Sequence, residues 1–268
     1  MNNTKSTGIP FSAVALSIAV AALAEPFPPA LPQTLLQGAA AAVISGVLAA
    51  WVGICCRPCG LLGRCIYRTV LAVLLVAELV QTAVQAQYVC RQEFASMALI
   101  GLLPLLLWAG WKLPLSGWEA PARVLWWLAA LGGAVCVLGL WGQMHWERLV
   151  LLPDGAAGEW TTPLYAEYFL LPVLGGKQKP CRTLFLPMGT YCIRVCAALS
   201  FALVFGASRY PARELLRAWS VGAFSRIDAF LILIWFCGAM FRICFLAAML
   251  RKILQESQNS NNPEGARE

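Results

Sequence analysis

One long apolar stretch of the sequence, AVLLVAELVQTAVQAQY, contains a set of regularly spaced polar residues. Glu78, Gln81 and Gln85 are spaced i, i+3 and i+7, so a helix would place them on one face. A polar stripe at membrane depth normally faces other helices or water, where it can bind a small polar molecule or line an ion path. Hydrogen bonding between helices is the commoner role of such a stripe, and the sequence leaves both roles open.

Glu167 is a further candidate, because it lies in a short apolar segment, LYAEYFLLPVL, between two tyrosines. Residues 165–174 are too few to cross a bilayer as a plain helix. A short segment interrupted by proline and glycine is typical of a broken helix that lines a cavity. Anchoring at the membrane–water boundary is the alternative, since tyrosine favours that boundary. We take Glu78, Gln81, Gln85 and Glu167 as candidate ligand-binding residues.

Arg242 lies inside a membrane-length apolar run, 227–250, with Trp235 and Gly238. An arginine at the centre of such a helix costs about 2.5–3.5 kcal/mol on insertion scales. The residue is roughly 22 Å along the helix from Ile227, at about 1.5 Å per residue. This position is past the midplane and near enough to the cytoplasmic side for the side chain to snorkel. We therefore expect a structural role for Arg242.

Enzymatic and metal chemistry have little support in the sequence. His145 is the single histidine and lies outside the apolar segments. There is no Ser-His pairing, no HExxH motif and no glycine-rich phosphate loop. Cys56 and Cys59 form one CxxC pair, but no second pair at zinc spacing accompanies it. The sequence predicts a protein that is not an enzyme and uses no metal or cofactor.

The composition indicates an integral membrane protein. The chain has 268 residues, of which 60% are hydrophobic and 12% charged, against roughly 45–50% and about 25% in soluble domains. Residues 71–76 and 102–107 are continuously apolar, which excludes the alternation of a membrane barrel. The net charge of +7 comes from basic residues at segment ends, where membrane orientation explains them without a nucleic-acid partner.

The predicted fold is an all-α, polytopic membrane helix bundle of about eight spans in residues 1–254, followed by a polar tail, 255–268, expected to be disordered. With the N-terminus inside, most basic loops fall on the cytoplasmic side. The basic segment 208–225 falls outside, so either it is a surface helix over the outer mouth or one segment is not a span. The expected spans are 9–24, 35–56, 66–88, 95–111, 123–143, 165–174, 183–206 and 227–250.

Several motifs, in order along the chain, resemble one family of membrane proteins. They are Gly60 to Tyr67, the Gly-x-Glu-x-x-Ala-Arg element at 117–123, Tyr210-Pro211, Glu214 to Arg217, Arg226-Ile-Asp228, and the set Trp235, Gly238 and Arg242. Together they resemble the permease-like B subunit of endospore germinant receptors, within the amino acid–polyamine–organocation transporter superfamily.

The resemblance implies a shortened form of the inverted-repeat transporter fold, which has five helices plus five. It implies a small-molecule germinant, such as an amino acid, bound near the midplane where the first and sixth helices break. It also implies assembly with two other receptor subunits in the lipid bilayer of the spore inner membrane.

Three functions follow as hypotheses. The first is a receptor subunit in the spore inner membrane, or bacterial cell membrane, that senses a nutrient and triggers spore germination. The second is a secondary amino acid transporter. The third is a structural membrane subunit that binds no ligand.

Overall fold

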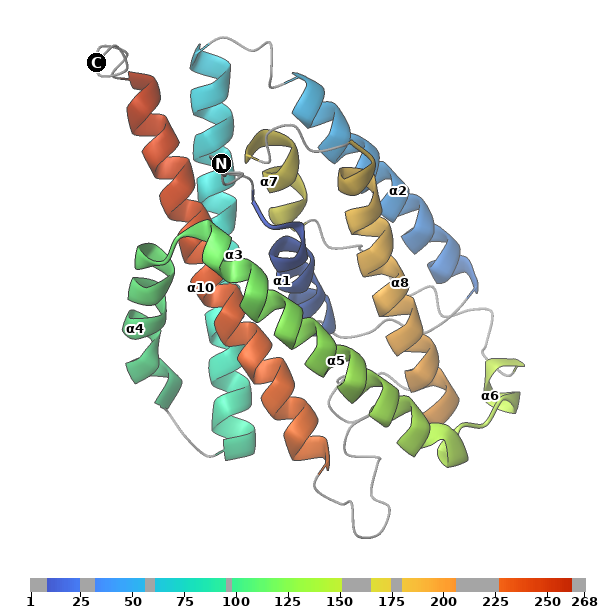
Figure 1. The fold of residues 1–268 in the computed structure, drawn as a ribbon. Coiled ribbons are helices and arrows are strands. Elements are labelled where there is room, and N and C mark those ends of the chain that lie inside the picture. The colour runs from blue at the N-terminus through green and yellow to red at the C-terminus, as the bar shows by residue number, and fades with distance from the viewer. Residues whose placement is uncertain are drawn as a thin grey trace, which may run out of the picture.

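The structure is a computed structural model that describes residues 9–24, 32–55, 61–94, 98–150, 165–174, 180–205 and 227–261. All regular elements within these ranges are helical (Figure 1). The α-helices are α1 (Phe11–Ala24), α2 (Pro32–Cys55), α3 (Leu61–Phe94), α4 (Ala98–Lys112), α5 (Glu119–Leu140), α6 (Glu147–Val150), α7 (Glu167–Leu174), α8 (Pro180–Phe205) and α10 (Ile227–Asn261). Two short 3-10 turns, Leu115–Trp118 and Trp141–Gln143, flank α5.

Within the described residues, five helices are long and apolar enough to cross a membrane, which confirms the prediction of a multi-pass helical membrane protein. A helix suits this environment because it satisfies all its backbone hydrogen bonds within one segment. The apolar stretches are Leu35–Val52, Cys65–Glu93, Leu115–Leu140, Thr183–Val204 and Phe230–Gln255.

The eight expected spans all coincide with helices, but three of these are short. Helices α1, α4 and α7 have 14, 15 and 8 residues, so even α4 rises only about 22 Å, against about 30 Å of hydrocarbon. The count of eight spans therefore stays a prediction. Near the C-terminus, α10 does not end where the polar tail, 255–268, was expected to begin, but continues to Asn261.

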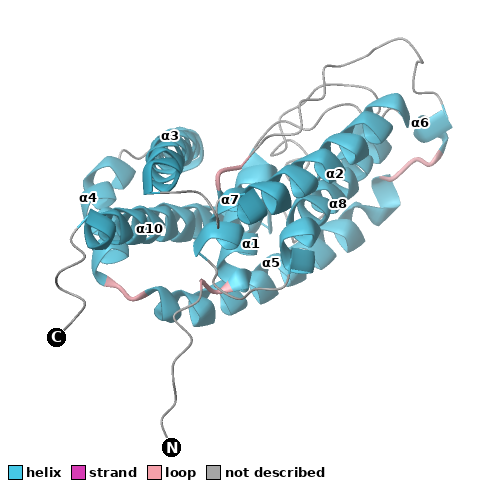
Figure 2. Cartoon of the chain, turned by 90° about the horizontal axis from the view of Figure 1, so that it is seen from above, coloured by secondary structure: helices cyan, strands magenta, loops and turns pink. Residues whose placement is uncertain are grey.

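The helices form two groups with short helices between them. Helix α10 packs against α3 and α4, and α2 packs against α8. Figures 1 and 2 show α1 and α7 between these groups, with α5 crossing beside α1. Helix α1 contacts α5, α7, α8 and α10. The two short helices therefore lie in the interior of the bundle.

Helices α1 and α10 form the core because both are apolar around their circumference. In the apolar stretch of α10, 67% of residues are buried, against 29% or less in the other four long helices. In α1, Ala13, Val14 and Ile18 have no exposed surface. The side chains that these two helices present to each other therefore lie away from both lipid and water.

Gly110 lets α4 approach α10 closely. A Cβ at this position would overlap the backbone carbonyl of Cys244 and lie 3.0 Å from Cβ of Ala247. Since Gly110 faces backbone, the overlap cannot be relieved by rotating a side chain. We expect Gly110→Ala to lower the free energy of unfolding in detergent by about 1–3 kcal/mol, the usual effect of overpacking.

Gly101→Ala, on the same helix, is the matched control. No atom lies within 4 Å of a Cβ built there, so this change should raise stability by up to about 1 kcal/mol through helix propensity. Equal melting temperatures for the two variants would contradict the close packing of α4 on α10.

Parts of several expectations lie outside the described residues. These parts include the basic segment 208–225, Cys56, Cys59 and residues 262–268 of the tail. The predictions made for them remain predictions.

Candidate functional site

Three charged side chains from three helices meet inside the bundle. Arg242 of α10 donates from Nε and Nη2 to Oε1 of Glu167 in α7, at 3.1 and 2.9 Å. The same Nη2 donates to Oε2 of Glu78 in α3. The exposed fractions of the side chains are 4% for Arg242, 0% for Glu167 and 14% for Glu78. We call these three residues the buried ion cluster.

Two hydroxyl groups also contact the cluster. Ser17 of α1 donates to Oε1 of Glu167 at 2.8 Å. Arg242 donates from Nη1 to Oγ1 of Thr82 at 2.7 Å, and Thr82 in turn donates to the carbonyl oxygen of Glu78 at 2.7 Å. The cluster therefore links α1, α3, α7 and α10 through groups that are far apart in the sequence.

The start of α7 holds the two carboxylates in place. The backbone N–H of Ala166 donates to Oε1 of Glu78, and Glu167 is the first residue of the helix. Negative charge is favoured at a helix N-terminus, where unpaired N–H groups and the helix dipole point outward. The guanidinium of Arg242 also lies 5.9 Å from the ring centroid of Tyr165, which adds a cation–π contact.

Charge within the cluster is not balanced. Two carboxylates share one guanidinium, which gives a formal net charge of −1 in the bundle interior. Oε2 of Glu167 is buried and has no hydrogen-bond partner among the described residues. A buried charge is strongly unfavourable unless it is paired. The cluster is therefore one positive charge, or one hydrogen-bond donor, short of full compensation.

The four candidate residues predicted from the sequence do not form one site. Glu78 and Glu167 come together in the cluster, as described above. Gln81 lies on the exposed side of α3, and Gln85 lines a neighbouring cavity. The predicted stripe therefore contributes Glu78 to the cluster but not Gln81 or Gln85. The face of α3 that contacts Arg242 carries Glu78 and Thr82, which are four residues apart.

Arg242, Ser17 and Thr82 were not among the candidates. The position of Arg242 allowed snorkelling, but its guanidinium instead contacts two carboxylates in the interior. The burial cost of an arginine in an apolar run was a usable signal, since it requires a partner. Ser17 and Thr82 gave no such signal. Tyr165 and Tyr168 are 4% and 1% exposed, so they do not mark a membrane boundary.

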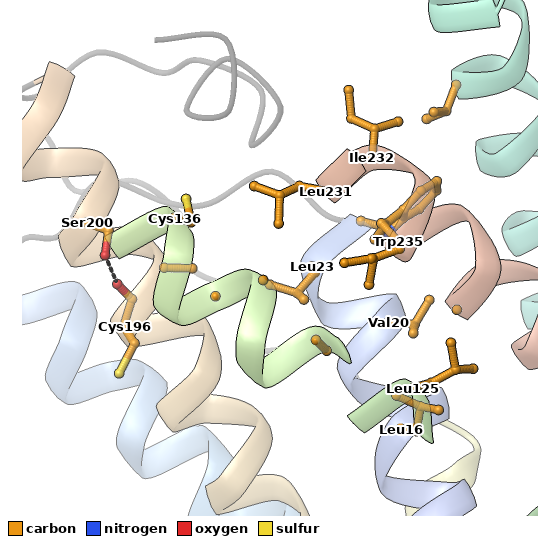
Figure 3. A pocket seen from close by; sticks show the side chains of 18 of the residues that line it. Leu16, Val20, Leu23, Leu125, Cys136, Cys196, Ser200, Leu231, Ile232 and Trp235 are labelled. Atoms are coloured by element: carbon orange, nitrogen blue, oxygen red, sulfur yellow. Dashed lines mark hydrogen bonds between the residues drawn. The ribbon is translucent and has the colours of Figure 1, made fainter. Parts of the chain in front are cut away.

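An apolar cavity of about 650 Å³ lies beside the cluster. Its walls come from α1, α3, α5, α8 and α10, and Figure 3 shows Leu16, Val20 and Leu23 of α1 opposite Trp235 of α10. Helix α1 belongs to both sites, because it contributes Leu16 and Val20 to the cavity and Ser17 to the cluster. Binding in the cavity would therefore act on a helix that also holds Glu167.

No protein family, curated protein or solved structure matches the chain.

The chemistry available to the cluster is ionic binding. Its free carboxylate oxygen can accept a proton or a hydrogen bond from a cationic group. Within the described ranges, no group of three or more His, Cys, Asp or Glu side chains is placed to hold a metal ion. Cys65, six residues after the CxxC pair, is free and exposed.

Proposed function

We propose that the chain is an integral membrane subunit of a spore germinant receptor that senses a small nutrient, such as an amino acid, and triggers germination. The sequence motifs supply the family, and one structural observation supports the sensing role. Glu167 is completely buried, carries an unpaired oxygen and lies at the start of a short interior helix. Intramembrane ionisable residues of this kind usually mark a ligand or ion pathway.

The charge of the cluster suits a nutrient with an ammonium group. Such a group would supply the positive charge that Arg242 alone does not provide for Glu78 and Glu167. A bound molecule that competes for these carboxylates would also alter contacts among four helices. Ligand binding would then shift a conformational equilibrium by its difference in affinity for the two states.

The positions of the short helices support the transporter-like fold that this proposal requires. Helices α1 and α7 are the first and sixth of the eight expected segments, and both lie in the interior. In an inverted-repeat transporter, broken helices meet at the binding site near the midplane. The repeat itself, the spore inner membrane location and the two partner subunits belong to the proposal.

Germination of a deletion strain tests the proposed function. Spores that lack the gene should lose the response to at least one nutrient in a panel, and the wild-type gene should restore it. Glu167→Gln should fail to restore the response at equal protein level, because one of the two carboxylates that pair with Arg242 is lost. Glu119→Gln should restore it, since Glu119 is an exposed residue that pairs with Arg123 on the same helix.

Two outcomes would count against the receptor. An unchanged response of the deletion strain to every nutrient would remove the sensing role. Uptake of labelled amino acid by the protein in liposomes would instead favour a secondary transporter, the second candidate, because buried acidic residues such as Glu78 and Glu167 also serve ion-coupled transport.

A further inference from the structure

The unpaired oxygen of Glu167 has a neighbour that could satisfy it. Oε2 of Glu78 and Oε1 of Glu167 both accept from the same Nη2 atom of Arg242, so the two carboxyl groups lie next to each other and one can donate to the other once it is protonated. Two ionised carboxylates cannot donate to each other, because both are acceptors only. One proton would therefore provide the missing donor and remove the net charge at the same time.

The other groups around the pair do not remove the charge. Arg242 is the cation that contacts both carboxylates, and Tyr165 contacts Arg242 through its ring. The described part of α2, which packs on α7, contains no charged residue, and α1 contributes Ser17. Arg194 of α8 is buried but is not among the described hydrogen-bond or ion-pair partners of either carboxylate.

A metal cation fits this place poorly. Hard cations such as Ca²⁺ take six to eight oxygen ligands, roughly, whereas a proton needs one acceptor. Three of the four carboxylate oxygens of the pair already accept hydrogen bonds from Arg242, Ser17 or Ala166. One free oxygen on Glu167 remains, which is enough for a proton.

We propose that Glu78 and Glu167 together hold one exchangeable proton at neutral pH, so that the buried ion cluster is a proton-binding site within the membrane bundle. The proton belongs to the pair, since two strongly interacting acids titrate jointly. Exchange with the outside passes through Glu78, whose side chain is 14% exposed, because Glu167 is completely enclosed.

Loss of the proton has a structural consequence. It leaves a net negative charge among α3, α7 and α10 and two repelling carboxylates at the start of α7. The contact between α3 and α7 should then weaken. The inference does not depend on the proposed function, because it requires only that these three side chains are buried together.

Infrared spectroscopy of the full chain in lipid nanodiscs tests the proton directly. At about pH 7 the wild type should show the carbonyl-stretch band of a protonated carboxylic acid, which should weaken as the pH is raised to about 10. Glu78→Gln and Glu167→Gln should each lack this band, because one remaining carboxylate and Arg242 balance without a proton. Glu119→Gln, an exposed control, should keep it.

Two results in a sodium-containing buffer would overturn the inference. One is the absence of the band from the wild type at about pH 7, and the other is its survival in both glutamine variants at the cluster. Replacing sodium in the buffer by N-methylglucamine should leave the band unchanged; a band that increases only when sodium is removed would show that a metal cation occupies the site instead. These readouts do not involve germination, so they can fail separately from the proposed function.

Discussion

Replacing Arg242 by glutamine should lower the free energy of unfolding by about 3–5 kcal/mol, the usual effect of removing one partner of a buried ion pair. The change leaves Glu78 and Glu167 in the interior without the cation that both contact. It also leaves Thr82 without the Nη1 donor. Thermal and denaturant unfolding of the purified protein in detergent measure the loss.

Arg123→Gln is the matched control for this experiment. Arg123 is 68% exposed and pairs with Glu119 one turn away, and exposed pairs of this kind contribute only about 0.3–0.5 kcal/mol. Similar stability of the two variants would contradict the buried ion cluster.

A double variant separates lost charge balance from lost packing. Arg242→Gln together with Glu167→Gln removes one charge of each sign and leaves Glu78 as the single carboxylate of the cluster. We expect this double variant to be more stable than Arg242→Gln alone, because fewer uncompensated charges remain buried. A double variant whose destabilisation equals the sum of the two single effects would indicate that Arg242 and Glu167 do not interact.

Phe245→Ala should have the second largest effect, about 2.4 kcal/mol. Phe245 has no exposed surface and stacks on Phe241 with ring centroids 5.9 Å apart. Truncation would leave a cavity of roughly 100 Å³, which costs about 24 cal/mol per Å³. The transfer contribution seen in soluble proteins is largely absent, because lipid is as apolar as the protein interior.

Phe230→Ala on the same helix provides the comparison. Phe230 is 51% exposed, so its truncation should change the free energy of unfolding by much less. Detergent unfolding of both variants measures the difference. If Phe230→Ala were the more destabilising, α10 would not be the central helix of the bundle.

The helical architecture and the membrane location were predictable from the sequence because both depend on local composition. A bilayer accepts continuous apolar runs as helices, whatever their neighbours are. The long apolar stretches of α2, α3, α5, α8 and α10 were recognised for this reason. The short segment at Glu167 was recognised in the same way, from the proline and glycines in its sequence.

The contacts of individual side chains were decided by the tertiary structure. Thr82 and Gln81 are adjacent in the sequence, yet one contacts Arg242 and the other lies on the exposed side of α3. Local spacing defines a face of a helix but not the direction in which that face points. That direction was set by the packing of α3 against α10 and by the approach of α7.

The partners of Arg242 show most clearly what local sequence spacing cannot predict. Its ion pair with Glu78 joins residues 164 positions apart, and no periodicity in a single sequence encodes such a distance. The sequence by itself determined that Glu78, Glu167 and Arg242 are ionisable groups within apolar segments, where burying each one is costly. Only the folded bundle decided that these three groups meet and leave one negative charge uncompensated, since the cost of burial is reduced when opposite charges share one interior site.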